Sequence, residues 1–187
     1  LLSCLIKVYA LNKFEKAFGE KFIFEDRKLI LEKAGFRFLN VRNQDVPTYV
    51  MHGAADLGVV GLDVLEEKEY DLIKLLDLQL GRCKVAFGLR AGEQLDFNKS
   101  KITIATKHEV IAKKYFEQKA MAVEIIKLYG SIELAPLVGL CDCIVEIVET
   151  GETMKQNGLE VGPTIMESSA HLIANKNSFY AKKDLIL

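Results

Sequence analysis

The 187-residue sequence contains no tryptophan and only three prolines, and neither sign of charge is in excess. Its 25 lysines and arginines are balanced by 26 aspartates and glutamates, which gives a net charge of −1. This balance excludes a polybasic surface of the kind that binds nucleic acid or anionic membranes. No apolar run approaches the ~20 residues that a membrane-spanning helix needs. We therefore expect neither nucleic acid nor a membrane among the partners of this protein.

Cysteine is also scarce, and its spacing argues against a metal site. The four cysteines form no Cys-x-x-Cys pair, and no cluster among the three histidines matches them. Because zinc sites need such clusters, no set of side chains here predicts a metal ion by itself. Cys141 and Cys143 are spaced to lie on one face of a strand, where small apolar thiols pack well. We expect a reduced protein located in the cytoplasm.

Hydrophobic residues make up half of the chain, which is enough for a substantial core. Short apolar runs alternate with amphipathic stretches, and this alternation predicts an α/β fold. We expect strands at 5–10, 24–32, 36–41, 57–60, 72–80, 84–89, 102–105, 123–128, 143–148 and 164–174. The second and third of these should form a hairpin around Lys33-Ala34-Gly35. We expect helices at 47–52, 63–68, 108–119, 133–140 and 154–157, with Asp45 as the N-cap of the first.

A loop rich in glycine, aspartate, asparagine and serine, from Ala91 to Ser100, is the best candidate for a domain boundary. We predict two α/β lobes, one formed by residues 1–88 and 164–187 and the other by residues 89–163. A ligand cleft is expected between the lobes. Ligands of open α/β sheets bind where strands end, and glycines and acidic residues follow the strands here.

The junction after the strand Cys143–Val148 carries the strongest chemical signal. The turn Glu149-Thr150-Gly151-Glu152-Thr153 leads into a short polar helix, whose first N–H groups are unpaired and favour a phosphate. The threonine hydroxyls can add donors, and glycine lets the backbone approach a ligand closely. The carboxylates would repel a bare phosphate, which suggests that a ribose or a metal ion binds there too. An ordinary capped turn remains an alternative, since threonine is a good N-cap.

Several segments, in collinear order over about residues 27–175, resemble the ATP phosphoribosyltransferase family. Each match is modest, but the ordered set is specific. The matching segments are Val41–Val50, His52–Asp63, Leu80–Cys83, Ile104–Lys107, Gly130–Pro136, Asp142–Gly158 and Glu167–Ala170.

The resemblance implies a two-lobed fold with mixed sheets, like that of periplasmic binding proteins. It also implies Mg²⁺-dependent transfer of a phosphoribosyl group from phosphoribosyl pyrophosphate (PRPP) to N1 of ATP, the first step of histidine biosynthesis. The residues that it assigns to PRPP are Asp142, Glu146, Glu149, Thr150, Gly151, Glu152 and Thr153. Those that it assigns to ATP are Lys13, Gly61, Leu62, Asp63 and Glu133.

Three residues are expected to act in the transfer itself, namely Arg42, Arg82 and Glu149. The arginines would stabilise the pyrophosphate as it leaves, although each could instead form a surface ion pair. Lys107 is a third basic residue within a matching segment. Glu146 stands where family members often have aspartate, which keeps the charge and lengthens the reach.

The chain departs from the family after its first strand. Ala10-Leu11-Asn12-Lys13 runs directly into Phe14–Gly19, which resembles the end of the first helix, so a loop and the start of that helix are absent. Either a mobile phosphate-binding loop is missing from this sequence, or a real deletion has occurred. We favour the first, because a deletion would remove the first helix from an otherwise intact core.

The chain ends at Leu187 and so resembles the short form of the family, which lacks a regulatory domain; a truncated long form stays an alternative. Short forms imply an oligomer with a regulatory subunit related to histidyl-tRNA synthetase. Two other functions remain open. The chain could be a catalytically silent subunit, or a ligand-binding two-lobed protein of the same fold.

Overall fold

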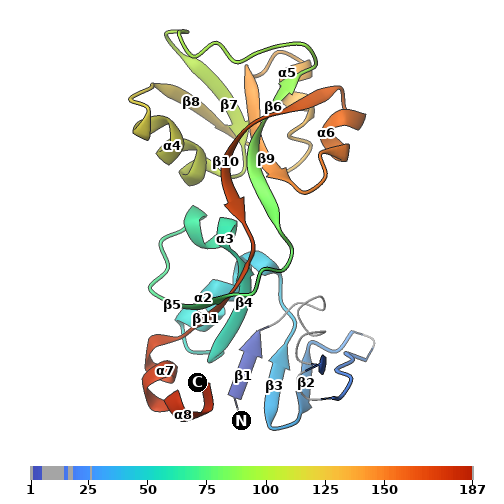
Figure 1. The fold of residues 1–187 in the computed structure, drawn as a ribbon, viewed down its shortest axis with the longest axis vertical. Coiled ribbons are helices and arrows are strands. Elements are labelled where there is room, and N and C mark those ends of the chain that lie inside the picture. The colour runs from blue at the N-terminus through green and yellow to red at the C-terminus, as the bar shows by residue number, and fades with distance from the viewer. Residues whose placement is uncertain (1, 6–14, 17–18, 26, 187) are drawn as a thin grey trace. The chain divides into compact units, whose positions relative to one another are not determined.

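The computed structural model describes residues 2–5, 15–16, 19–25 and 27–186 (Figure 1). The chain divides into two compact units, the first formed by Leu1–Gly81 with Ser169–Leu187 and the second by Arg82–Ser168. Each unit is built around its own sheet. Within the described residues, we find no helix of the length and apolar character needed to cross a membrane.

The first unit contains a mixed, six-stranded sheet in the order β2-β3-β1-β4-β11-β5. β1 pairs in parallel with both β3 and β4, whereas β11 runs antiparallel to β4 and β5. The strands are β1 (Leu2–Leu5), β2 (Ile30–Lys33), β3 (Phe36–Leu39), β4 (Leu57–Gly61), β5 (Ile73–Asp77) and β11 (Ala170–Ala174). The predicted hairpin is confirmed, because Ala34 and Gly35 both take positive φ between β2 and β3.

The helices of the first unit are short. They are η1 (Asn43–Asp45), α2 (Val46–Met51), α3 (Leu62–Glu67), α7 (Lys176–Ala181) and α8 (Lys183–Ile186). Val46 and Val50 of α2 pack on β4 so closely that a Cβ at Gly58 would lie 2.7 Å and 2.8 Å from their methyl carbons. α2 starts after Asp45 as predicted, but the Asp45 side chain makes no capping hydrogen bond.

The second unit contains a five-stranded sheet in the order β10-β6-β9-β7-β8. β7 is parallel to β8 and β9, and β6 is antiparallel to β9 and β10. The strands are β6 (Cys83–Arg90), β7 (Ile102–Thr106), β8 (Val123–Lys127), β9 (Cys143–Val148) and β10 (Leu159–Ser168). The helices are α4 (Glu109–Gln118), α5 (Leu134–Leu137) and α6 (Glu152–Gln156).

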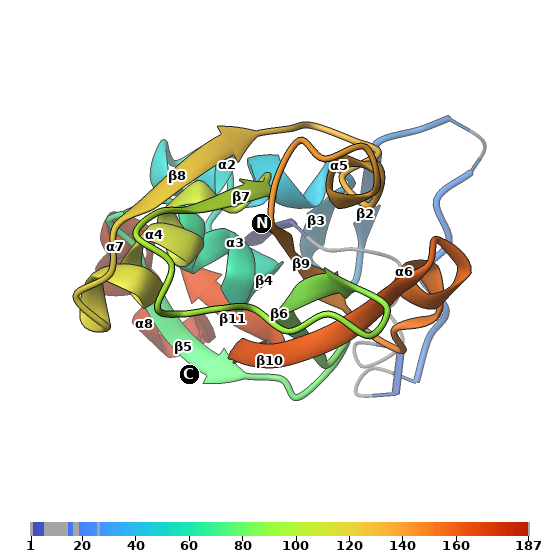
Figure 2. The same cartoon turned by 90° about the horizontal axis from the view of Figure 1, so that it is seen from above.

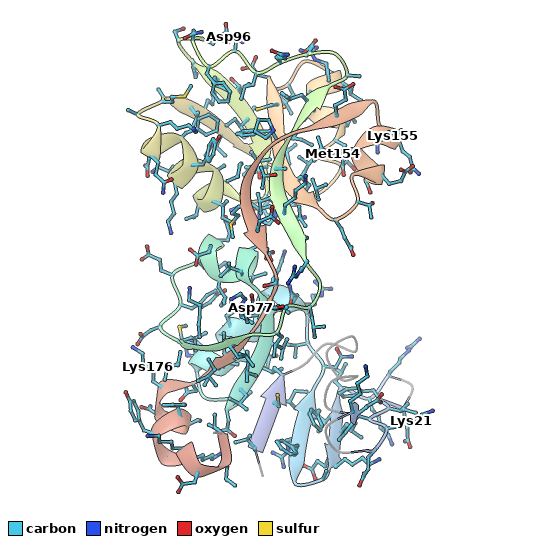
Figure 3. The ribbon with its side chains drawn as sticks, in the orientation of Figure 1. Lys21, Asp77, Asp96, Met154, Lys155 and Lys176 are labelled. Carbon is cyan, nitrogen blue, oxygen red and sulfur yellow. The ribbon has the colours of Figure 1, made fainter. Side chains whose placement is uncertain are left out.

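Two apolar clusters hold the helices of the second unit to its sheet. One contains the rings of Phe87, Tyr115 and Phe116, which meet edge to face where α4 packs on the sheet. The other joins Ile144 of β9 to Met154 of α6. Figure 3 shows Met154 pointing toward the sheet, whereas its neighbour Lys155 points away from it. α6 is therefore anchored at the end of β9 by one buried side chain.

The single strand predicted at 164–174 is two strands in the structure. β10 pairs with β6 from Leu159 opposite Arg90 to Ser168 opposite Cys83, and β10 lies along β6 in both Figure 1 and Figure 2. β11 then begins at Ala170, in the sheet of the first unit. Because β6 and β10 pair along their whole length, residues 82–88 and 164–168 belong to the second unit, whereas the sequence placed them in the first lobe.

Candidate functional site

A pocket of about 270 Å³ opens at the carboxyl end of β9. All of its lining residues belong to the second unit. They are Glu133, Glu146, Ile147, Val148, Glu149, Thr150, Gly151, Thr153 and Met154. The turn that the sequence singled out therefore forms one wall of a cavity.

The turn between β9 and α6 depends on Gly151. Its φ is +82°, which glycine adopts without the steric cost of a Cβ. A Cβ there would also lie 3.0 Å from Cγ2 of Val161, which is closer than side chains normally approach. The chain can thus leave β9 and enter a helix at once, with its backbone at the pocket wall.

The first turn of α6 presents hydrogen-bond donors. The N–H of Glu152 donates to the hydroxyl oxygen of Thr150 over 3.3 Å. The main-chain bonds of the helix begin with Lys155, whose N–H donates to the Gly151 carbonyl over 3.1 Å. The N–H groups ahead of Lys155 therefore lie at the positive end of the helix dipole, where an anion is favoured.

Glu146 is the buried carboxylate of the pocket, with 9% of the residue exposed. Its Oε1 accepts a 2.8 Å hydrogen bond from the N–H of Ile147 and lies 2.8 Å from Nζ of Lys107. Burial alone would raise the pKa of Glu146, but these donors and the nearby His108 ring outweigh it and lower the pKa. Glu146 is therefore ionised at neutral pH despite its burial.

The elements that carry these residues explain why they meet. β7 and β9 are parallel, so their carboxyl ends lie at the same edge of the sheet. Lys107 and His108 follow β7 directly, and Thr106 is opposite Val145, the residue before Glu146. His108 is 5% exposed, and its Nε2 lies 3.6 Å from Glu146 Oε1.

Five of the seven residues assigned to PRPP line the pocket together: Glu146, Glu149, Thr150, Gly151 and Thr153. Glu152 lies beside them at the start of α6, where its Oε1 accepts a hydrogen bond from the Gln156 amide over 3.2 Å. Glu133, which the sequence assigned to ATP, lines this same pocket.

Asp142 lies apart from the other predicted PRPP residues. It precedes β9, at the opposite end of the strand from the pocket. Its carboxylate accepts hydrogen bonds from the N–H of Thr103 over 2.8 Å and from Lys99 Nζ over 2.6 Å. These contacts give Asp142 a role in joining β7 to β9, and we leave it out of the proposed binding site.

The residues predicted to contact ATP or pyrophosphate lie mostly in the first unit. The Asp63 carboxylate folds back over Gly61, so that a Cβ at Gly61 would lie 2.2 Å from Asp63 Oδ1. Leu62, between them, donates its N–H to the Ser169 carbonyl over 3.0 Å. Arg42 is exposed in the first unit, and Arg82, also exposed, opens the second.

Lys13 lies outside the described residues. The roles of Arg42, Arg82, Gly61, Leu62 and Asp63 toward a ligand stay predictions. Two pocket neighbours were not predicted as such from the sequence. Lys107 was named only as a further basic residue in a matching segment, not as the partner of Glu146, and His108 was given no role. Only the pairing of β7 with β9 reveals them, and the sequence does not state which strands are neighbours.

Donor groups for a metal ion are limited within the described part of the chain. No three histidine, cysteine, aspartate or glutamate residues there are grouped so that they could hold one. The pocket nevertheless carries the carboxylates of Glu133, Glu146 and Glu149. Oxygen donors of this kind suit Mg²⁺, which commonly takes one or two carboxylates together with phosphate oxygens of a substrate.

Comparisons with known proteins agree with this geometry. The family model HisG, ATP phosphoribosyltransferase, matches residues 42–187. An ATP phosphoribosyltransferase of Wolinella succinogenes is 67% identical over 177 residues, which are 95% of this chain and 86% of the relative. One of Campylobacter curvus is 66% identical over 174 residues, covering 93% and 84% of the two chains.

Solved structures extend the likeness to the fold. A chain of the ATP phosphoribosyl transferase (HisG:HisZ) complex from Thermotoga maritima superposes with a TM-score of 0.83 at 34% identity, covering 100% of this chain and 93% of that one. The substrate-binding protein of an amino acid ABC transporter reaches a TM-score of 0.56 at 12% identity, covering 99% and 91%. The predicted α/β fold with mixed sheets, like that of periplasmic binding proteins, is thereby confirmed.

Proposed function

Because the chain belongs to the ATP phosphoribosyltransferase family, we propose that it transfers the phosphoribosyl group of PRPP to N1 of ATP, in the first step of histidine biosynthesis. The observation that carries the proposal is the pocket at the carboxyl end of β9. Its wall combines a helix N-terminus, two threonines and a glycine with positive φ, beside a buried and ionised glutamate. This combination fits a sugar phosphate.

PRPP would bind with its 5′-phosphate at the start of α6. The N–H groups of that turn and the hydroxyls of Thr150 and Thr153 would donate to the phosphate oxygens. Gly151 permits this turn because its φ is positive and because a Cβ there would crowd Val161. Glu146 and Glu149 would accept hydrogen bonds from the ribose hydroxyls, which a bare phosphate would not offer.

In the reaction, N1 of adenine attacks C1 of the ribose. The N1–C1 bond forms, the bond between C1 and the pyrophosphate oxygen breaks, and its electron pair leaves with pyrophosphate. N1 already carries a lone pair, so no strong base is required. The protein would accelerate the step by positioning two anionic substrates and by stabilising the leaving group. Gly61, Leu62 and Asp63 are proposed for ATP, and Arg42 and Arg82 for pyrophosphate.

Magnesium is part of the proposal. Bound to the pyrophosphate of PRPP, Mg²⁺ would supply positive charge that stabilises the leaving group. Glu149 and Glu133 line the pocket and are the carboxylates that would complete its coordination. No protein cage is needed, because Mg²⁺ keeps several waters and takes the remaining oxygens from the substrate.

A partner subunit is proposed as well. The similar chain from Thermotoga maritima is part of a HisG:HisZ complex. We propose that this chain forms a hetero-oligomer of the same kind, with a regulatory subunit related to histidyl-tRNA synthetase. Cys4, Cys141 and Cys143 are free thiols, which fits a reducing compartment, and the cytoplasm is the proposed location.

Release of pyrophosphate from ATP and PRPP, with and without the partner subunit, tests this function. We expect turnover that depends on Mg²⁺, and a loss of activity when Thr150 and Thr153 are both replaced by valine. Tight binding of PRPP without turnover, even with the partner present, would instead indicate a catalytically silent subunit. Absence of PRPP binding would indicate a ligand-binding protein of the same fold.

A further inference from the structure

Two donors converge on one oxygen of Glu146, and the His108 ring lies near it. Lys107 Nζ and the Ile147 N–H each lie 2.8 Å from Oε1, and His108 Nε2 lies 3.6 Å from it. No described residue forms a hydrogen bond or ion pair with Oε2. The carboxylate is therefore held by one oxygen while the other is left for a ligand in the pocket.

His108 is oriented toward this carboxylate without being bonded to it. Its side chain is 7% exposed, and its Nε2 is a buried nitrogen with no hydrogen-bond partner in the structure. Its main-chain N–H donates to the Thr106 hydroxyl over 2.8 Å, which fixes the backbone next to the ring. A buried nitrogen without a partner is costly, and a small movement of Glu146 would satisfy it.

Charge makes Lys107 important to the pocket. Glu133, Glu146 and Glu149 all line it, so the pocket would repel a polyanionic substrate if nothing compensated them. Lys107 is the basic residue that pairs with one of these carboxylates, and its side chain is 34% exposed. It can therefore keep its own charge hydrated while it neutralises the buried one.

We propose that Lys107, supported by His108, is a positioning residue for PRPP, which holds Glu146 through Oε1 so that Oε2 accepts a ribose hydroxyl. The inference rests on the proposed function and deepens it. Lys107 acts through Glu146 and does not touch the reacting atoms. Its effect is therefore specific to the sugar phosphate and leaves ATP binding unchanged.

The test compares Lys107→Met with the wild type, using the full chain together with its partner subunit. We expect the KM for PRPP to rise roughly tenfold or more, since a buried carboxylate loses its ion-pair partner. The KM for ATP should stay the same, whereas the melting temperature should fall, because the buried Glu146 carboxylate is left without its ion-pair partner. Calorimetric titration of PRPP should show the same weakening without any turnover.

The pH profile separates positioning from a merely structural role. The groups that face Glu146 are Lys107 and His108 after β7, with Glu133 and Glu149 on the pocket wall. Without Lys107, fewer groups would offset burial, so the pKa of Glu146 should be higher than in the wild type. The acidic limb of the pH profile of kcat/KM for PRPP should therefore move to higher pH in Lys107→Met. In Lys107→Arg, which keeps the positive charge, the limb should lie close to its wild-type position.

A matched control is available on the same strand. Lys101 precedes β7 and pairs with Glu124 over 2.8 Å at the opposite end from the pocket. Lys101→Met removes the same charge and should leave the KM for PRPP and the pH profile unchanged. His108→Asn, which retains a side-chain donor, should weaken PRPP binding less than Lys107→Met does.

The outcomes distinguish this inference from the proposed function. A wild-type complex without turnover would refute the proposed function. Calorimetric titration of PRPP into the wild type and Lys107→Met would still test whether the pairing of Lys107 with Glu146 supports PRPP binding. An active wild type with an unchanged PRPP affinity and pH profile in Lys107→Met would overturn the inference. So would equal losses for PRPP and ATP, or a loss of PRPP affinity that Lys107→Arg does not restore.

Discussion

The hydroxyl of Thr106, at the end of β7, donates a 2.6 Å hydrogen bond to the carbonyl oxygen of Val145 in β9. The same oxygen of Thr106 accepts the N–H of His108 over 2.8 Å. One buried side chain thus ties the end of one parallel strand to its neighbour and to the start of the next loop. Lys107 and Glu146, which meet at the pocket, are the residues that follow these two strand positions.

Replacement of Thr106 by valine should destabilise the protein by about 1–3 kcal/mol. The isosteric side chain would leave the Val145 carbonyl and the His108 N–H unpaired in the interior. Urea unfolding measures the loss, and Thr106→Ser, which keeps the hydroxyl, is the control. A stability equal to that of the wild type would contradict the importance of this bond.

Alanine at position 151 should weaken PRPP binding and stability together. The positive φ of this position would cost an alanine about 1–2 kcal/mol, and the new Cβ would press on Val161. Gly158→Ala is the control, because Gly158 has a φ of +72° and no atom within 4 Å of its Cβ position. We expect both variants to melt earlier and only Gly151→Ala to raise the KM for PRPP. Equal KM values would remove this turn from the site.

A carboxylate at position 153 should abolish PRPP binding without unfolding the chain. Thr153 is exposed on α6 and lines the pocket, so Thr153→Glu would place a further negative charge where the phosphate is expected. The affinity should fall roughly a hundredfold or more. Gln156→Glu adds the same charge to the same helix away from the lining, and titration calorimetry should show it near the wild-type affinity. Unchanged binding in Thr153→Glu would place the phosphate elsewhere.

The ion pair between Asp56 and Lys182 should give the first unit a stability that depends on pH. Both carboxylate oxygens of Asp56 accept from Lys182 Nζ at 2.8 Å, and Oδ2 also accepts the N–H of Ser3. Burial alone would raise the pKa of Asp56, but these donors outweigh it and lower the pKa. This stability is therefore fully present above the unfolded pKa of about 3.9 and is lost as the pH falls through the lower folded pKa.

Asp56→Asn should consequently cost about 1.5–3 kcal/mol at neutral pH, and the difference from the wild type should shrink below about pH 4. Urea unfolding at several pH values measures it. Glu25→Gln is the control, since Glu25 and Lys28 form an exposed pair whose loss should leave the stability nearly unchanged. A difference that stays constant down to pH ~3 would rule out the carboxylate as its source.

Features written in short stretches of sequence could be predicted. The apolar run Cys143–Val148 forms β9, and the turn Glu149–Thr153 forms the pocket wall, because burial and turn chemistry act within a few residues. The hairpin at Ala34 and Gly35 followed from the same local rules. Local chemistry therefore located the candidate site before any tertiary contact was known.

Features that depend on strand order could not be predicted. Lys107 reaches Glu146 only because β7 lies beside β9, although the two residues are far apart in the sequence. Asp142 shares the matching segment with the pocket residues, yet it lies at the other end of β9, because a strand separates its ends by about 3.3 Å per residue. The break at Ser169 between β10 and β11 likewise reflects pairing with different sheets.

The placement of β11 has a consequence for how the chain folds as it is synthesised. β11 lies between β4 and β5, so the first sheet stays divided until residues 170–174 have left the ribosome. The second unit is one uninterrupted stretch and needs nothing beyond Ser168. The pocket of the second unit can therefore form while the sheet of the first unit, although most of it was synthesised earlier, still lacks β11.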